Sequence, residues 1–254
     1  MGRDIQAIKI TGEDRRKYRD KVRRSLDVFA RMLREQWFDD NPSMVGQEIE
    51  LNIVDERGMP SMRNAEALKA IADPLWATEV GQFNLEINVP PRQLSGDAFG
   101  GLEREVRADL NAADANARTI GCNLVMIGIL PTLDEFDVHE GTMSANERYR
   151  VLNQQIFAAR GEDMEIGIDG AEHLLTHCDS ITPEAACTSV QLHTQVSPDG
   201  FADYWNAAQA IAGVQVALGA NSSAATRSEG WNGRSAPTST RRTPTPVPSA
   251  ATWS

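Results

Sequence analysis

The sequence predicts an α+β fold in which strands with one acidic face are accompanied by amphipathic helices. Three stretches alternate apolar and polar residues, which is the period-2 pattern of a half-buried strand: 46–55, 81–89 and 190–196. Other stretches place apolar residues three and four positions apart, which is typical of a helix that packs on one side. The hydrophobic content of 41% in 254 residues is enough for a real core, in one large domain or two small ones.

The polar faces of these three strands are unusual because they carry no Lys or Arg. They consist of Glu48, Glu50, Asn52, Gln82, Asn84, Glu86, Asn88, Gln191, His193 and Gln195. A solvated strand face usually carries Thr, Lys and Arg, because Asn is a poor strand former and Glu is mildly disfavoured. Neighbouring carboxylates repel each other unless a cation lies between them. We therefore expect a site for a hard divalent ion such as Mg²⁺ on a concave sheet, with three solvated strand faces as the alternative.

Two helices are expected in the first third of the chain. Residues 13–37 place apolar side chains at helical spacing opposite a face rich in Arg and Lys, which suits an anion, a partner or plain solvent. The first acidic strand follows, and a turn over 56–60 ends it. Residues 64–73 are expected to form a shorter helix that ends before Pro74.

The second acidic strand is expected to extend backward far enough to include Glu79. Glu79 precedes Glu86 by seven residues, which would put the two side chains on opposite faces of a straight strand. A bulge near Gly81 would bring both carboxylates to one side. The double proline at 90–91 is expected to end the strand.

The second half of the chain is expected to combine helices with one buried strand. Residues 101–119 form a helix, and the apolar run 123–130 indicates a central strand that is buried on both sides. Residues 144–147 (SANE) are a capping box for a helix that runs to about Arg160. A last helix to about Leu218 should turn these side chains inward: Phe201, Trp205, Ala208, Ile211 and Val214.

Other residues give weaker chemical signals. Arg148 lies near the start of the 144–160 helix, and its planar, charged guanidinium group is suited to binding a carboxylate or a phosphate. The sequence is equally consistent with an ordinary surface arginine. His173 and His177, with Glu172, would form a helical metal pair, but the sequence around them lacks the HExxH order. The cysteines fit no CxxC pattern, lie in no basic setting and are expected to be reduced and buried: Cys122, Cys178 and Cys187.

Charge and hydropathy exclude several classes of protein. A net charge of −11 and a pI near 4.9 argue against general binding of nucleic acid or acidic membranes. The N-terminus has no apolar signal core, and no apolar run approaches membrane-spanning length. A cytoplasmic protein is therefore expected.

Four motifs carry a resemblance to a known family. In chain order they are GQEIELNIVD, EVGQFNLEINVPP, NERYRVLNQQ and SVQLHTQV. They resemble the glutamate–cysteine ligase and carboxylate–amine ligase family, in particular its type-2 bacterial branch, over roughly residues 10–222. The resemblance implies a glutamine-synthetase-like catalytic fold: a curved, mostly antiparallel sheet with helices packed on its outer face, whose concave face holds Mg²⁺ and the phosphates of ATP.

The resemblance also implies an activity and a set of site residues. ATP would phosphorylate the side-chain carboxylate of glutamate, and the amine of cysteine would displace phosphate, as the first step of a γ-glutamyl thiol pathway. The residues matching the family's metal ligands are Glu48, Glu50, Glu79, Glu86 and His193. Candidates for substrate or nucleotide binding are Arg148, Tyr149 and Gln191. A histidine ligand departs from an all-oxygen set and leaves room for Mn²⁺ as well as Mg²⁺.

The end of the chain departs from the family pattern. Residues 1–222 read as the N-terminal part of the catalytic domain, whereas 223–254 are rich in Ser, Thr, Pro and Arg and contain no Leu, Ile, Phe or Met. Such a segment is expected to be disordered. A frameshift or truncation of the gene and a genuine flexible tail are both consistent with it. If part of the catalytic sheet is missing, this chain is expected to bind metal more weakly than a full-length relative and to show little or no ligation.

Three other functions remain open at this level. One is a carboxylate–amine ligase that uses another amine, because the motifs do not identify the amine pocket. Another is a metal-dependent hydrolase in which the carboxylates and His193 activate water. The third is a non-catalytic binding protein that keeps the sheet. The expected partners are small molecules, and a second copy of the chain would be one way to cover an exposed sheet edge.

Overall fold

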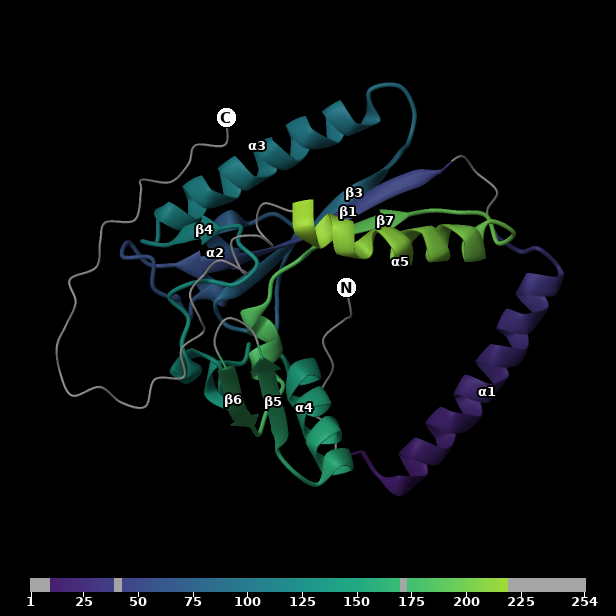
Figure 1. Ribbon diagram of the computed structural model, residues 1–254, viewed down its shortest axis with the longest axis horizontal. Helices are drawn as coiled ribbons and strands as arrows, with labels where there is room; N and C mark the ends of the chain where they lie inside the picture. Colours follow the sequence, from purple (N-terminus) through teal and green to yellow (C-terminus); the bar gives the residue numbers. More distant parts are fainter. Residues whose placement is uncertain (1–9, 39–42, 170–172, 219–254) are drawn as a thin grey trace.

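The computed structural model describes residues 10–38, 43–169 and 173–218 (Figure 1). The predicted tail at 223–254 and Glu172 lie outside these residues. The helices are α1 (Gly12–Arg34), α2 (Asn64–Ile71), α3 (Ala98–Arg118), α4 (Glu147–Arg160) and α5 (Phe201–Leu218), with short 3₁₀ helices η1 (Glu135–Asp137), η2 (Glu140–Thr142) and η3 (Thr182–Ala186). The strands are β1 (Met44–Val54), β2 (Trp76–Thr78), β3 (Asn84–Gln93), β4 (Asn123–Val125), β5 (Met164–Asp169), β6 (His173–Cys178) and β7 (Val190–Thr194).

The long strand β1 is the centre of a five-stranded sheet. β3 occupies one of its edges, and β2 continues the sheet beyond β3. β7 and β4 share the other edge, where β7 pairs with residues 45–49 and β4 pairs with residues 52–54. Every pairing is antiparallel, so the predicted α+β class with a mostly antiparallel sheet is confirmed.

The apolar face of this sheet forms the main core. Ile49, Leu51 and Ile53 of β1 alternate with the polar residues, as predicted, and are at most 2% exposed. They pack with β3 and with helices α2 and α3, which cover this face (Figure 1). A second buried cluster around Phe83 holds the 3₁₀ helix η3 and the start of α4 against the end of the sheet. The two clusters together fix the polar face of β1 and β3.

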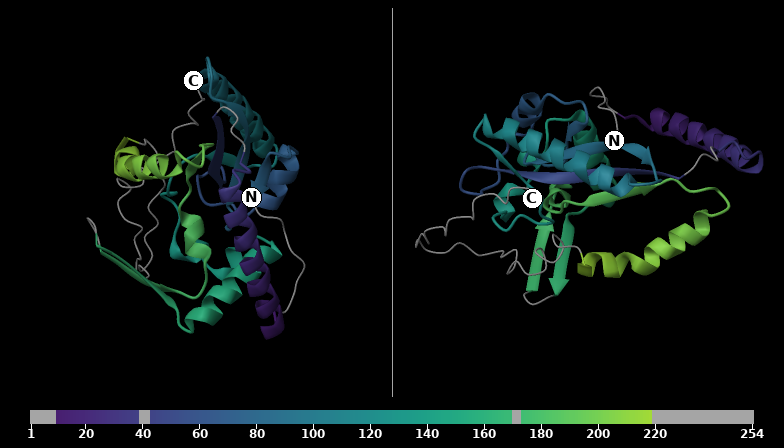
Figure 2. Two further views of the ribbon diagram at one scale, coloured as in Figure 1. Left: turned by 90° about the vertical axis from the view of Figure 1, so that its right-hand side faces the viewer. Right: turned by 90° about the horizontal axis from the view of Figure 1, so that it is seen from above.

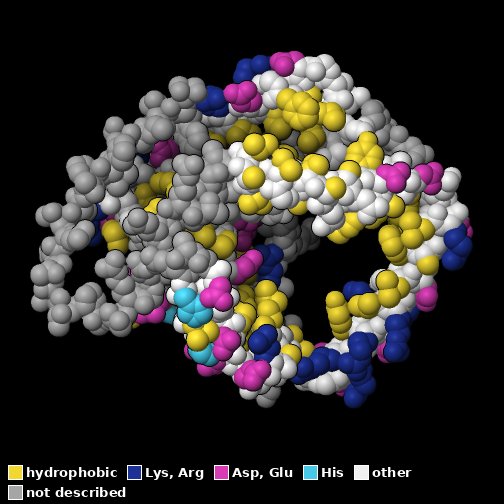
Figure 3. All heavy atoms as spheres, in the orientation of Figure 1, with side chains coloured by type: hydrophobic (Ala, Val, Ile, Leu, Met, Phe, Trp, Pro, Cys, Tyr) yellow, Lys and Arg dark blue, Asp and Glu magenta, His cyan; other side chains and the backbone are white. Residues whose placement is uncertain are grey.

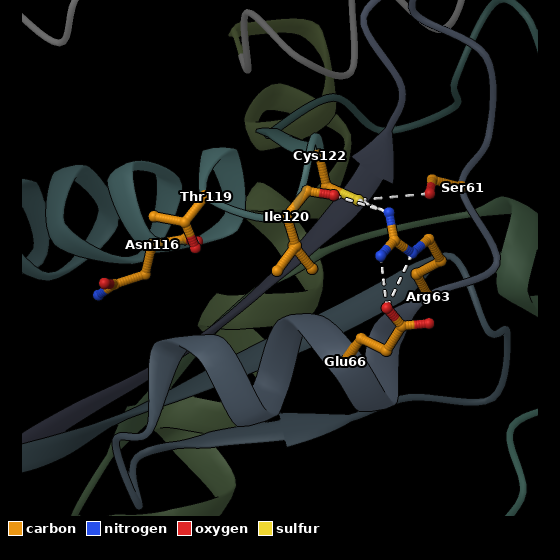
Figure 4. Close-up of polar contacts among 7 residues, drawn as sticks. All are labelled: Ser61, Arg63, Glu66, Asn116, Thr119, Ile120 and Cys122. Atoms are coloured by element: carbon orange, nitrogen blue, oxygen red, sulfur yellow. Dashed lines mark hydrogen bonds and ion pairs between the residues drawn. The ribbon is translucent and has the colours of Figure 1, made fainter.

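A polar contact joins the beginning of α2 to the end of α3 (Figure 4). Arg63 donates from Nη1 to the carbonyl oxygen of Ile120 at 2.7 Å and pairs with Glu66. The buried thiol of Cys122 lies 3.5 Å from the hydroxyl of Ser61. Cys122 is therefore a packed structural residue, as predicted, whereas Cys178 is partly buried and Cys187 is exposed.

The second acidic stretch is a hairpin rather than one bulged strand. β2 runs antiparallel to β3, with Ala77 opposite Glu86, and a turn at Gly81 reverses the chain between them. The Asn84 amide donates to the Gly81 carbonyl oxygen at 3.0 Å, which closes this turn. The prediction of a bulge near Gly81 is therefore wrong. The expectation that Glu79 and Glu86 lie on the same side still holds, because the hairpin brings Glu79 back beside Glu86.

The double proline does not end β3, contrary to expectation. The strand runs to Gln93, and the register shifts between the pairs Gln47–Val89 and Val45–Arg92. The prolines fall within this irregularity, where the ladder does not need their missing N–H groups. The Cβ of Pro91 lies 3.6 Å from the position that a Cβ on Gly46 would take.

The apolar run 123–130 is not a central strand. Only Asn123–Val125 pair with β1, at its edge, and residues 125–129 are partly exposed. The rest of the run turns toward the segment before β7: the Ile127 carbonyl oxygen accepts from the Asn52 side chain, and the Gly128 carbonyl oxygen accepts from the Thr188 amide. Apolar composition alone did not distinguish a strand from this irregular connection.

The helices at the two ends of the described chain pack less than expected. α1 has no buried residue and stands apart from the sheet in Figure 2. α5 also has no buried residue, so the inward side chains predicted at Phe201, Trp205, Ala208, Ile211 and Val214 are exposed (Figure 3). None of the described helices is both long and apolar enough to cross a membrane.

The cap of α4 also differs from the predicted capping box. Asn146, not Ser144, is the N-cap, and its side chain accepts from the Arg148 amide at 2.9 Å. The Ser144 hydroxyl instead donates to the Glu79 carbonyl oxygen and accepts from the Asn64 side chain at 2.7 Å. The sequence signal therefore marked the right place in the chain but gave the serine the wrong role.

We expect Asn146→Ala to lower the free energy of unfolding by about 1 kcal/mol, because the α4 amide would lose its acceptor. Asn146→Asp keeps the acceptor and is expected to match the wild type within experimental error. Urea denaturation followed by circular dichroism measures both variants. An equal loss in Asn146→Asp would show that this side chain does not act as the cap.

Candidate active site

Two glutamates face each other at the centre of the polar sheet face. Glu50 of β1 lies directly opposite Glu86 of β3 in the antiparallel register. The Glu86 side chain is 5% exposed and accepts a 2.5 Å hydrogen bond from Asn88 Nδ2. Glu50 accepts from the Ser189 amide at 2.8 Å, which ties it to the segment entering β7. The sequence prediction that these two carboxylates share one face is confirmed.

Glu79 joins this pair from the end of β2. Burial raises the pKa of Glu79 to about 8, and a hydrogen bond to Glu86 and the charges of Glu86 and Glu50 act in the same direction. Burial also raises the pKa of Glu50, with the charges of Glu86 and Glu184 adding to the effect. Three carboxyl groups thus lie close together, and the charge of Glu86 makes ionisation of Glu50 and Glu79 harder.

Tyr149 and Arg148 reach the carboxylates from α4. The buried Tyr149 hydroxyl lies 3.3 Å from Glu79 Oε2, to which it donates, and it accepts from Arg148 Nη2 at 2.8 Å. The Arg148 guanidinium also lies over the Tyr149 ring, 4.7 Å from its centre. Burial raises the pKa of Tyr149 to about 12, so the hydroxyl keeps its proton as a donor. Arg148 therefore reaches Glu79 through Tyr149.

His193 and Glu48 form a second group further along the same face. His193 Nε2 lies 3.4 Å from Glu48 Oε1, and Gln191 pairs with Glu48 across the β1–β7 ladder. Both side chains line an open hollow of about 470 Å³ above the ends of β1, β3 and β7. Glu48 and Glu50 are two residues apart on one strand, so their backbones are separated by about 7 Å. The predicted metal residues therefore lie on one face in two neighbouring groups.

The chemistry of these side chains fits a hard divalent cation. The donors are carboxylate oxygens and one imidazole nitrogen, and among the described residues no Lys or Arg forms an ion pair with Glu50, Glu79 or Glu86. Within the same part of the chain, no three His, Cys, Asp or Glu side chains already converge as a finished metal cage. The carboxylates would have to rotate inward to share a cation, and the charge of the cation would offset their mutual repulsion.

The helical metal pair at His173 and His177, which the missing HExxH order already disfavoured, does not form. Both residues lie on β6, where they pair with Asp169 and Glu165 of β5 across an exposed hairpin. Figure 3 shows histidines at this place beside acidic side chains. Residues four apart on a strand are separated by about 13 Å, which is too far for one metal ion.

Glu184 was missed by the sequence analysis. It lies on η3, outside the three alternating strands, and its charge acts on both Glu50 and Cys187. No periodic pattern surrounds it, and only the three-dimensional path of the chain before β7 brings it near Glu50. Asn84 was recognised as part of the polar face but was given no role.

Fold and site together define a class: an α+β protein whose antiparallel sheet gathers carboxylates on one face and packs helices on the other. The model of glutamate–cysteine ligase family 2 matches residues 44–232, and the chain belongs to this family. The resemblance carried by the four motifs is thereby confirmed. Membership indicates ATP-dependent carboxylate–amine ligase activity, with small-molecule substrates, ATP and Mg²⁺ typical of the family. Searches of curated proteins and of solved structures gave no significant match.

Proposed function

We propose that this protein joins the side-chain carboxylate of glutamate to the amine of cysteine at the expense of ATP. The observation that carries the proposal is the group of Glu50, Glu79 and Glu86, whose charges lie together without a Lys or Arg ion pair among the described residues. Family membership supplies the reaction class, and the choice of glutamate and cysteine is the part proposed.

The reaction has two steps. A carboxylate oxygen of glutamate bonds to the γ-phosphorus of ATP, the bond between that phosphorus and the β,γ-bridging oxygen breaks, and ADP departs, giving an acyl phosphate. The amine nitrogen then attacks the acyl carbon, phosphate departs with the bonding electron pair, and the nitrogen loses a proton to give the amide. Phosphoryl transfer depends mainly on positioning and on neutralisation of charge, and little on covalent help from the protein.

The residues on the polar face have distinct proposed roles in this reaction. Glu48, Glu50, Glu79, Glu86 and His193 would hold Mg²⁺ or Mn²⁺. When bound, such ions would neutralise and bridge the phosphate oxygens of ATP. Tyr149 holds Glu79 in place through its hydroxyl, and Arg148 holds Tyr149. Gln191 and the open hollow beside His193 offer room for nucleotide or substrate.

Incubation with glutamate, ATP, Mg²⁺ and a panel of amines tests the proposal, with release of ADP as the readout. We expect ADP release to be slow, to require both glutamate and an amine, to be fastest with cysteine, and to give a γ-glutamyl product in mass spectrometry. Hydroxylamine in place of the amine should trap the acyl phosphate as a hydroxamate, which tests the first step alone.

The outcomes separate the competing functions. A faster reaction with another amine would keep the ligase class and replace cysteine. Hydrolysis of a substrate without nucleotide would indicate a metal-dependent hydrolase. Absence of both ADP release and hydroxamate would contradict catalysis by this chain.

A further inference from the structure

A small, partly open pocket lies beside Glu50 and Glu79, separate from the wider hollow at His193. Its volume is about 30 Å³. Besides these two glutamates it is lined by Val80, Asn84, Glu184, Ala185, Cys187 and Thr188. A volume of this size holds a single water molecule or a bare ion and excludes an organic amine or a phosphate group. Oxygen atoms from three different segments of the chain border it.

Asn84 supplies a buried oxygen without a partner. Its side chain is 2% exposed, and Oδ1 has no hydrogen-bond partner. The orientation of the amide follows from its neighbours: Asn52 Nδ2 donates to the Ile127 carbonyl oxygen at 3.1 Å, so Asn52 Oδ1 faces Asn84 and accepts from its Nδ2 at 3.0 Å. Because the Asn84 nitrogen already donates to Asn52, the Asn84 oxygen is the side-chain atom left to face the small pocket.

Gly81 makes room for this oxygen. A Cβ on Gly81 would lie 2.5 Å from Asn84 Oδ1 and 2.9 Å from the Cβ of Ala185. Any other residue at position 81 would therefore force the amide or η3 to move. The absence of a side chain at Gly81 therefore lets η3 approach the β2–β3 turn at the wall of the small pocket.

Glu184 reaches the same space from η3, which is anchored by buried Ile181, Thr182 and Ala185. Glu184 lines the small pocket together with Glu50 and Cys187, and it is also exposed to solvent. The part of the chain that the structure describes shows no Lys or Arg in an ion pair with Glu184. The polar side chains around this space are thus acceptors of hydrogen bonds, with few donors among them.

We propose that Asn84 Oδ1 and Glu184 are two further oxygen ligands of a divalent cation that Glu50 and Glu79 share. The inference rests on the proposed function, because the cation is the one that the ligase reaction requires. A buried amide oxygen that faces carboxylates gains a partner only from a cation or a donor, and a space of this size limits the cation to a bare ion such as Mg²⁺ or Mn²⁺.

Titration with Mn²⁺, followed by electron paramagnetic resonance of the free ion, tests Glu184 without requiring activity. We expect Glu184→Gln to raise the Kd for Mn²⁺ roughly tenfold, because a charged ligand is lost. Glu135→Gln, on the exposed 3₁₀ helix η1, is the matched control and should leave the Kd unchanged. The tenfold effect should persist at 0.5 M KCl, since direct ligation is screened little by salt.

Asn84→Asp tests the amide oxygen. A carboxylate in the same place should tighten Mn²⁺ binding, and circular dichroism confirms that the variant is folded. Unchanged or weaker binding by the folded variant would remove Asn84 from the ligand set. Mn²⁺ binding by Glu184→Gln that equals wild type, or a defect that vanishes in 0.5 M KCl, would remove Glu184.

Comparison with Glu86→Gln separates this inference from the proposed function. If Glu86→Gln loses Mn²⁺ while Glu184→Gln and Asn84→Asp bind like the wild type, the inference fails and the metal-dependent ligase proposal stands. If the wild-type protein binds no Mn²⁺, both fail.

Discussion

Glu86→Gln is expected to abolish the stabilisation of this protein by divalent metal and to lower ligation at least 100-fold. Wild-type protein in Mn²⁺ at 100 times its Kd should gain about 2.7 kcal/mol in the free energy of unfolding, because the ion binds only the folded state. The variant removes the most buried carboxylate of the central group, directly opposite Glu50. Loss of one preorganised electrostatic group in a phosphoryl-transfer site lowers the rate by about 10²–10³-fold.

The metal-free variant should behave in the opposite way. With Glu86 neutral, repulsion with Glu50 and Glu79 falls, and the apo protein should become more stable than the wild type. Thermal unfolding with and without Mn²⁺ measures both effects. Glu56→Gln, in the exposed turn after β1, is the control and should keep the full metal response. A Glu86→Gln variant that loses stability without metal and still responds to Mn²⁺ would show that Glu86 is a structural residue.

The stability of the metal-free protein should fall as the pH rises from about 4.5 to 8. Glu79 has a pKa of about 8 in the folded protein against 4.5 ordinarily, so the folded state keeps a proton that the unfolded state releases across this range. The raised pKa of Glu50 acts in the same direction. After allowance for the partial exposure of Glu79, we expect its titration to lower the free energy of unfolding by about 1–3 kcal/mol between pH 4.5 and pH 8.

Urea denaturation of the apo protein at several pH values measures this slope. Glu79→Gln should flatten it, whereas Glu56→Gln should leave it as in the wild type. Saturating Mn²⁺ should reverse the slope, because the ion binds the deprotonated carboxylates. A metal-free protein whose stability does not decrease above pH 4.5, or a Glu79→Gln variant with the wild-type slope, would contradict the arrangement of the three carboxyl groups.

The alternating strands could be predicted from the sequence because a period of two ties each residue to one face. Because Glu48 and Glu50 were expected on the polar face, Ile49 and Ile53 were expected on the buried face, and the structure confirms this. The absence of Lys and Arg from the polar faces then marked the site. The buried face and the polar site could both be predicted from this local pattern, without knowing which strands are neighbours in the sheet.

The failures share a different cause, which is that distant contacts decided the local structure. Asn146 caps α4 because Ser144 is taken up by Glu79 and Asn64, and the sequence does not show that competition. The apolar run at 123–130 leaves the sheet because β7, far along the chain, takes the same edge of β1. Glu184 approaches Glu50 only through the second buried cluster.

The shared edge of β1 has a consequence for how the site assembles. The β7 ladder covers residues 45–49 and the β4 ladder covers residues 52–54, and between them the Glu50 N–H donates to the Ser189 carbonyl oxygen at 3.0 Å. Glu50, Glu79 and Glu86 lie on or directly beside strands β1, β2 and β3, which form one continuous part of the sheet. His193 lies on β7, a strand of five residues. The place of His193 beside Glu48 therefore depends on the pairing of β7 with β1, whereas the strands that carry the three glutamates pair with one another without β7.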